Sequence, residues 1–323
     1  MTATGRGKER VDVGEPVAIG IDVGGTKVVA ATLDGDGRVL QRLRRETPVG
    51  DGRRLVDELE ALLGELGAAV PVGVGIAGLV TPAGLVRYGP NISVQDLDLA
   101  AALRQRTGQP VAVVNDASAA ALGEQRVGAG RGHRDVVMLT LGTGVGGGVV
   151  VGGRLVTGAN GFAGELGHVI VEDGGRPCPC GNRGCLEAYA AGSAIGRRAA
   201  QRLADERTPS LLREVDECTG KAVTLAARDG DELAREVLLE AGRWLGIAIA
   251  GLVNALDPEV VLLGGGAAAE TATWLLPEAR ETMAARIIGH DWREPPALEL
   301  AALGDDAGMV GAGLLAADGE GDR

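Results

Sequence analysis

One glycine-rich stretch, residues 158–187, holds a histidine and three cysteines at spacings that suit a metal ion. Cys178 and Cys180 are separated by one proline, which is too short a spacing for an easy mutual disulfide but suits two thiolates on one ion. Structural zinc sites have four nitrogen or sulfur ligands and no open position. The stretch therefore predicts a structural zinc ion on His168, Cys178, Cys180 and Cys185. The alternative is a group of buried small side chains with an ordinary core histidine.

Two carboxylates flank these ligands along the chain. Glu165 precedes His168 by three residues, and Glu187 follows Cys185 by two. A loop closed around one ion would bring both carboxylates to the same place, where they could accept hydrogen bonds from hydroxyl groups. We therefore expect a site for a polyhydroxy ligand beside the metal.

Two segments of the chain each read as strand, glycine turn and strand. The first is VAIGIDVGGTKVVAATLDGDGRVL and the second is VVMLTLGTGVGGGVVVGGRLV. Setting Asp22 against Gly142 aligns them at an offset of 120 residues. The repeat predicts two similar α/β halves.

Each glycine turn could present backbone N–H groups to phosphate oxygens with no side chain between them. A single turn of this kind is usually a plain hairpin, whereas two facing turns would hold one nucleotide. Neither turn is followed by the helix that a dinucleotide-binding fingerprint or a P-loop requires, so those two classes are disfavoured. The predicted nucleotide-binding residues of the two turns are Asp22, Gly24, Gly25, Thr26, Lys27, Gly142, Thr143 and Gly144.

Other candidate residues follow apolar strands. The strand PVAVVND ends at Asn115 and Asp116 before an alanine-rich helix, so Asp116 is either a functional carboxylate or a helix cap. Asn91 follows Pro90 in a segment that also fits an ordinary turn. After the strand VVLLG, a glycine run could let a flat ring approach the backbone, or could be a loose loop. That run is Gly264, Gly265 and Gly266.

Composition favours an enzyme of the cell interior. The 323 residues are 45% apolar, with a net charge of -12 that argues against a nucleic-acid or anionic-membrane surface. No apolar run follows the basic residues near the N-terminus, so no secretory signal is predicted. The apolar run at residues 244–256 suits a buried helix better than a bilayer span. We expect a cytoplasmic protein with no membrane or nucleic-acid partner.

Taken together, the motifs DVGGTK, LGTGVGGG, GELGH and CPCGNRGCLE resemble the ROK family (repressors, open reading frames, sugar kinases), and within it the zinc-containing ATP-dependent glucokinases. The resemblance covers residues 19–316. It implies an α/β fold of the actin-like ATPase and sugar kinase type, with two α/β domains and a duplicated β-hairpin phosphate motif around a central cleft. The implied parts are a small domain at 17–118 joined by a returning helix at 305–317, a large zinc-bearing domain at 119–304, and mobile tails at 1–16 and 318–323.

The same resemblance implies phosphorylation of glucose at its 6-hydroxyl by ATP with Mg²⁺, and a homodimer or homotetramer. Asp116 would be the general base. The implied glucose contacts are Asn91, Asn115, Asp116, Glu165, His168 and Glu187.

Two alternatives stay open. Departures from the family pattern at residues 92–94, Ser118 and Leu186 leave the hexose uncertain, so N-acetylmannosamine, allose or fructose are alternative substrates. A sugar-responsive regulator is disfavoured, because such relatives carry a DNA-binding segment before the first phosphate motif and only 21 residues precede Asp22 here.

Overall fold

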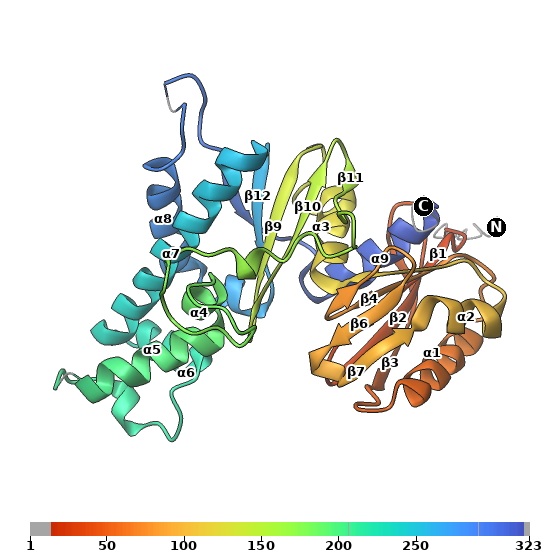
Figure 1. Cartoon of the computed structure of the whole chain (residues 1–323), viewed down its shortest axis with the longest axis horizontal. Coiled ribbons are helices and arrows are strands. Elements are labelled where there is room, and N and C mark those ends of the chain that lie inside the picture. Colours follow the sequence, from red (N-terminus) through yellow and green to blue (C-terminus); the bar gives the residue numbers. More distant parts are fainter. Residues whose placement is uncertain (1–13, 206, 290, 320–323) are drawn as a thin grey trace, which may run out of the picture.

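The computed structural model describes residues 14–205, 207–289 and 291–319, which form two five-stranded sheets flanked by helices (Figure 1). The first sheet has the order β3-β2-β1-β4-β8 and the second has the order β11-β10-β9-β12-β13. The first sheet's strands are β1 (Ala18–Val23), β2 (Lys27–Leu33), β3 (Val39–Glu46), β4 (Val72–Ile76) and β8 (Val111–Asn115). The second sheet's strands are β9 (Val136–Leu141), β10 (Val145–Val151), β11 (Arg154–Leu155), β12 (Val260–Gly264) and β13 (Ala297–Leu300).

Each sheet combines an antiparallel hairpin with parallel strands. β1 pairs with β2 antiparallel and with β4 parallel, and β9 does the same with β10 and β12. Most residues of these strands are buried, as their continuous runs of Val, Ile, Leu and Ala require when both faces are covered. The predicted pair of similar halves is therefore confirmed.

The alignment of the two halves differs from the predicted one. β9 begins 118 residues after β1, at Val136 against Ala18, and β10 begins 118 residues after β2, at Val145 against Lys27. The offset of 120 was wrong because the second segment has several glycines in a row, and the letters alone allow more than one register. Thr140, not Gly142, is the counterpart of Asp22.

Two helices cover the outer face of the first sheet. They are α1 (Gly52–Leu66) and α2 (Leu99–Thr107), whose leucines pack on the strands in one core cluster. Asp51 caps α1 by accepting from the N–H groups of Arg53 and Arg54, and Gly67 ends it in the left-handed conformation at φ 64°. A small sheet of β5 (Leu79–Val80), β6 (Leu85–Gly89) and β7 (Val94–Asp98) lies beside them and carries the short helix η1 (Pro90–Ile92).

Two helices fill the space between the sheets (Figure 1). The helix α3 (Asp116–Val127) packs on β10 and β9 of the second sheet and on α9 (Ala307–Ala317). In turn α9 packs on β1 and β4 of the first sheet. Gly123 and Gly311 let the two helices approach, since an added Cβ on Gly311 would lie 1.8 Å from the carbonyl oxygen of Ala119.

The remaining helices cover the far side of the second sheet (Figure 1). The longest, α7 (Glu232–Leu256), is capped by Asp231 and contains the apolar run expected to be a buried helix. Packed with it is α8 (Gly266–Ala284). The others are α4 (Glu187–Ala190), α5 (Gly192–Asp205), α6 (Gly220–Arg228) and the short helices η2 (Leu166–His168) and η3 (Leu211–Glu214). The short helix η4 (Gly304–Asp306) instead leads directly into α9.

Within the described residues, no helix combines the length and the apolar character that a membrane crossing needs. The predicted tails fall mostly at residues 1–13 and 320–323, which lie outside the described residues. The domain boundaries stay a prediction. The expected break after residue 118 falls inside α3, which contacts both β10 and α9.

Candidate active site

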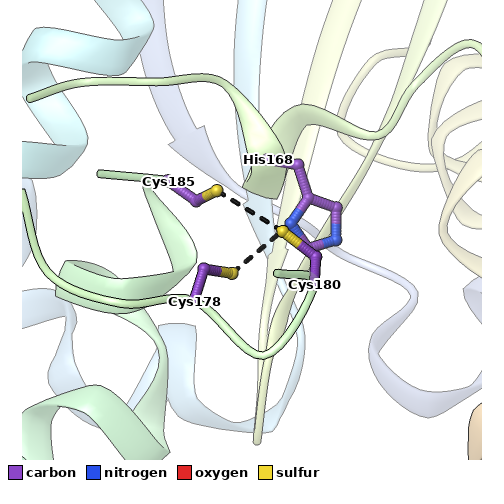
Figure 2. A group of neighbouring side chains, drawn as sticks. All are labelled: His168, Cys178, Cys180 and Cys185. Atoms are coloured by element: carbon purple, nitrogen blue, oxygen red, sulfur yellow. Dashed lines mark hydrogen bonds between the residues drawn. The ribbon is translucent and has the colours of Figure 1, made fainter. Parts of the chain in front are cut away.

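The histidine and three cysteines of the glycine-rich stretch converge on one point (Figure 2). Their candidate ligand atoms all lie within 4.8 Å of one another. His168 Nδ1 lies 3.8 Å from Cys178 Sγ, and Cys180 Sγ lies 3.7 Å from Cys185 Sγ. The chain turns back here because Gly184 has φ 80° and sits so close to the carbonyl oxygen of Glu172 that a Cβ would lie 1.7 Å from it.

These separations fit one tetrahedral zinc ion. Two sulfur ligands at about 2.3 Å from a tetrahedral ion lie about 3.8 Å apart. Without a cation, burial and the adjacent thiols raise the pKa of the Cys178 thiol to about 12, so at this cysteine the protein alone disfavours the thiolate. A divalent ion supplies the positive charge that thiolates need, and the donor set is therefore that of a metal site.

The cluster is joined directly to the two carboxylates. The other nitrogen of His168, Nε2, lies 3.8 Å from Glu165 Oε2, so one imidazole faces both the cysteines and a carboxylate. Glu187 begins α4 two residues after Cys185, and its Oε1 lies 3.8 Å from Cys178 Sγ. Its Oε2 accepts a hydrogen bond from the N–H of Val145 at 2.9 Å. Movement of the cluster would therefore move both carboxylates.

A cavity of about 720 Å³ brings most of the predicted site residues together. It lies between the small sheet, the start of α3, the second glycine turn and the loop that carries His168 and Cys180. The predicted residues that line it are Asn91, Asn115, Asp116, Gly142, Thr143, Gly144, Glu165, His168, Cys180, Glu187, Gly265 and Gly266. Six predicted nucleotide-binding residues do not line it, namely Asp22, Gly24, Gly25, Thr26, Lys27 and Gly264, and neither do the predicted metal ligands Cys178 and Cys185. An added Cβ on Gly264 would meet Met138, which makes that glycine part of the sheet's packing.

Asp116 is the first residue of α3 and is free of the capping role. Asn115 caps the helix, because its Oδ1 accepts from the N–H of Ser118 at 3.0 Å while its Nδ2 donates to the carbonyl oxygen of Gly78. Asp116 Oδ1 accepts instead from the adjacent N–H of Ala117 at 2.8 Å. Burial raises the pKa of Asp116 and the backbone N–H groups oppose the rise, so this carboxylate is more basic than a surface aspartate.

Burial also raises the pKa of Glu165. His168 opposes the rise, while Asp116 and Glu187 add to it by charge repulsion. Three acidic groups from three separate segments thus interact electrostatically around one cavity. Clustered carboxylates with shifted pKa values are common where a protein moves protons or binds hydroxyl groups.

The first glycine turn joins β1 to β2 and carries two charged residues. Burial raises the pKa of Asp22 to about 7, with a further contribution from Asp116 and an opposing one from Lys27. The Lys27 ammonium forms an ion pair with Asp305 at 3.0 Å. Gly25 packs on Asn91, whose carbonyl oxygen would lie 3.1 Å from an added Cβ. The turn therefore lies against the small sheet that carries part of the cavity wall.

The second glycine turn joins β9 to β10 and lines two cavities at once. Gly142 and Thr143 belong both to the cavity of Asp116 and to a neighbouring cavity of about 660 Å³. Hydrogen bonds fix the turn to α5, from the N–H of Gly192 to Gly142 and from the Ser193 hydroxyl to the carbonyl of Thr143.

The neighbouring cavity was not predicted from the sequence. Its walls come from α5, from the segment that leads into α6, and from the first turns of α8. Residues that line it include Ser193, Gly196, Cys218, Lys221, Glu270 and Thr271. The sequence offered one signal for it, the glycine at position 196. In the structure an added Cβ on Gly196 would lie 2.2 Å from the carbonyl oxygen of Cys218, so this glycine allows two segments to approach closely.

Comparison with known proteins agrees with this architecture. The profile of the ROK family matches residues 18–319. A glucokinase of Streptomyces coelicolor is 38% identical over 310 residues, which is 93% of this chain and 97% of that protein. An N-acetylmannosamine kinase of Escherichia coli O127:H6 is 34% identical over 308 residues, covering 92% of this chain and 97% of that protein.

A solved structure is similar over nearly the whole chain. The crystal structure of a ROK family glucokinase from Streptomyces griseus in complex with glucose and AMPPNP matches with a TM-score of 0.79 and 40% identity, covering 94% of this chain and 99% of that one. The predicted fold class is thereby confirmed, since two α/β halves with paired glycine turns form an actin-like ATPase fold of the sugar kinase type. The chain belongs to the ROK family.

Proposed function

We propose that this protein is an ATP-dependent hexose kinase that phosphorylates glucose at the 6-hydroxyl, with Asp116 as general base. The observation that carries the proposal is the second glycine turn, whose Gly142 and Thr143 line both cavities. A phosphate at this turn would lie between a helix-lined pocket large enough for a nucleoside and a cavity lined by carboxylates. Phosphoryl transfer needs such a positioning of donor and acceptor more than it needs covalent chemistry.

The nucleotide would occupy the 660 Å³ cavity, with its phosphates towards the glycine turns. Support comes from the start of α8. Gly265 has φ 85° and no side chain caps this 19-residue helix, so the N–H groups of Gly266 and Ala267 at its start have no hydrogen-bond partner among the described residues. Open N–H groups and the helix dipole favour a phosphate at a helix N-terminus. Mg²⁺ bound with ATP would offset the remaining phosphate charge.

The hexose would occupy the 720 Å³ cavity, where Glu165, Glu187 and Asn91 can accept or donate hydrogen bonds to its hydroxyl groups. As the 6-oxygen attacks the γ-phosphorus, the bond from that phosphorus to the oxygen bridging to the β-phosphate breaks and ADP leaves. The proton of the 6-hydroxyl passes to the carboxylate of Asp116. The raised pKa of Asp116 favours that transfer, since a base of higher pKa takes a proton more readily.

His168, Cys178, Cys180 and Cys185 would hold a structural Zn²⁺. With four protein ligands the ion has no open position, and it would supply rigidity instead of Lewis-acid chemistry. Through His168 and Cys178 it would keep Glu165 and Glu187 in place for the hexose. A cytoplasmic location and a homodimeric or homotetrameric state stay predictions.

A substrate panel tests the proposal. Glucose, N-acetylmannosamine, allose and fructose would each be tested with ATP, by ADP release, and with inorganic polyphosphate, by shortening of the polyphosphate chain. We expect the highest kcat/KM with glucose and ATP. N-acetylmannosamine is the specific alternative, because a kinase for that sugar is 34% identical to this chain. A higher kcat/KM with N-acetylmannosamine would replace glucose as the proposed substrate. Absence of phosphoryl transfer to any of the sugars would refute the proposed kinase activity.

A further inference from the structure

A third cavity, of about 760 Å³, lies away from the proposed active site and is lined by four arginines. Its walls are the β2–β3 hairpin, the end of α3 and the segment that leads into α9. It shares no lining residue with the two cavities described above. β2 runs from the first glycine turn to this hairpin, and seven residues of strand separate the two by about 20 Å. The arginines are Arg38, Arg42, Arg126 and Arg131.

The charge of this cavity opposes that of the whole protein. The chain has 44 acidic residues against 32 Lys and Arg, whereas the cavity is lined by four arginines and only two carboxylates, Asp36 and Asp306. Neighbouring carboxylates pair with part of this charge. Arg38 pairs with Asp36 at 3.1 Å and more loosely with Asp34, Arg42 pairs with Asp306, and Arg126 pairs with Asp318.

Two arginines retain unused hydrogen-bonding capacity. Arg131 has no side-chain hydrogen bond or ion pair within the part of the chain that the structure describes. Arg126 donates to Asp318 from Nη2, but its Nε is buried and has no partner among the described residues. A buried N–H without a partner is unfavourable unless a ligand or water satisfies it.

The walls of the cavity are held in place from behind. The carboxylate of Glu124 is fully buried and accepts from the N–H groups of Ala302 at 3.0 Å and Leu303 at 2.7 Å. It also accepts from the N–H of Ala129 at 2.8 Å, so the end of α3 and the segment before α9 are tied together. Gly37 at the hairpin tip has φ 74° and packs on Val127 of α3. The cavity is therefore a built feature of the fold.

We propose that this cavity is a binding site for a small phosphate anion with two or more negative charges. Arginine has a planar fork of N–H donors that matches phosphate oxygens, and several arginines around one concave site favour such an anion over a neutral ligand. A bound anion would contact both segments by which the chain passes between the two sheets.

Calorimetric titration with inorganic pyrophosphate, in the absence of ATP and hexose, tests the site. Arg131→Gln removes a guanidinium that has no hydrogen bond or ion pair to any described residue, and we expect the affinity to fall by about 10-fold, the loss typical of a charge-assisted hydrogen bond. Asp36→Asn removes a competing carboxylate and should raise the affinity. Arg53→Gln on the exposed start of α1 makes the same change of charge outside the cavity and should leave the affinity unchanged.

Each outcome bears on the proposal. Pyrophosphate that binds at the glycine turns instead would respond to neither Arg131→Gln nor Asp36→Asn, and that result would overturn the site, as would the absence of binding. If Arg131→Gln lowers the thermal unfolding temperature, its loss of affinity could come from a changed fold. The decision then depends on Asp36→Asn, where a raised pyrophosphate affinity supports the site and an unchanged affinity overturns it. A parallel titration with glycerol 3-phosphate shows whether an organic phosphate ester or an inorganic diphosphate binds more tightly. Because no step requires turnover, failure here is distinguishable from failure of the kinase proposal.

Discussion

The two glycine turns have the same place in their sheets but different chemical surroundings. The first is flanked by Asp22 and Lys27, whereas the corresponding positions of the second are Thr140 and Val145. The first turn is charged and reaches across to Asp305 through Lys27. The second is uncharged, and the N–H that follows it is held by Glu187. The duplication thus supplies two similar backbone turns, and only the first adds side-chain charge.

This difference suggests a division of roles. In the proposed function, the second turn would couple the phosphate position to the hexose carboxylates, because Glu187 contacts both this turn and the cysteine cluster. The first turn carries a buried carboxylate with a raised pKa, which a cation bound near the phosphates would help to ionise. The following predictions separate these roles.

The largest effect is expected for Asp116→Asn, which removes the base that both turns would serve. Loss of a general base typically lowers the rate by at least about 100-fold, and kcat should fall by that amount while calorimetric glucose affinity persists. The fold should be retained because Asn115, not Asp116, caps α3. Asp51→Asn at the start of α1 is the matched control. Near-normal turnover in Asp116→Asn would place the base elsewhere.

Cys180→Ser should disrupt the cluster of His168 and the three cysteines. Through that cluster it should displace Glu165 and Glu187, the proposed hexose ligands. We expect loss of bound zinc and a rise in the KM for glucose of about 10-fold or more, the scale of effects reported for support around metal ligands. Metal analysis and glucose titration measure the two effects. Cys218→Ser lies outside the cluster and should keep both zinc and glucose affinity. Unchanged glucose affinity in a zinc-free Cys180→Ser protein would separate the cluster from the sugar site.

A pair of glycine substitutions compares the turns directly. In Gly144→Ala the new Cβ would lie 2.5 Å from Glu187 Oε2, whereas in Gly24→Ala the nearest atom is the carbonyl oxygen of Lys27 at 3.3 Å. The first substitution should displace Glu187 and raise the KM for glucose by roughly 5-fold, about 1 kcal/mol of lost binding. The second should leave the glucose KM unchanged. Equal effects of the two changes would refute the proposed coupling to Glu187.

Asp22→Asn should alter how stability depends on pH. The ordinary pKa is 3.8 and the folded value is about 7, so between these values the native protein keeps a proton that the unfolded chain loses. The contribution of this group to stability therefore falls as pH rises through that window. At pH 8 the substitution should stabilise the protein relative to its effect at pH 5, on the order of 1 kcal/mol. Urea unfolding at both pH values measures this, with Asp98→Asn as control, and parallel pH profiles would contradict it.

The features that could be predicted from the sequence are those fixed by short stretches of chain. The four predicted metal ligands fall between residues 168 and 185, so local pattern was enough to predict that they converge. Local pattern also placed Asp116 after an apolar strand and before a helix, but left its role open. The pocket lined by Ser193, Lys221 and Thr271 was missed because three helical segments form it only after they pack together. The offset between the two halves was wrong because the glycines that follow Gly142 can be aligned with the first segment in more than one way. Only the paired strands of the structure fix the alignment.

The most direct test of the central claim is a crystal structure of this protein with glucose and AMPPNP. We expect the glucose 6-hydroxyl within hydrogen-bonding distance of the Asp116 carboxylate, with Glu165 and Glu187 on other hydroxyl groups and the terminal phosphate of the analogue at the second glycine turn. Glucose bound away from Asp116, or a nucleotide whose phosphates contact neither turn, would contradict the account.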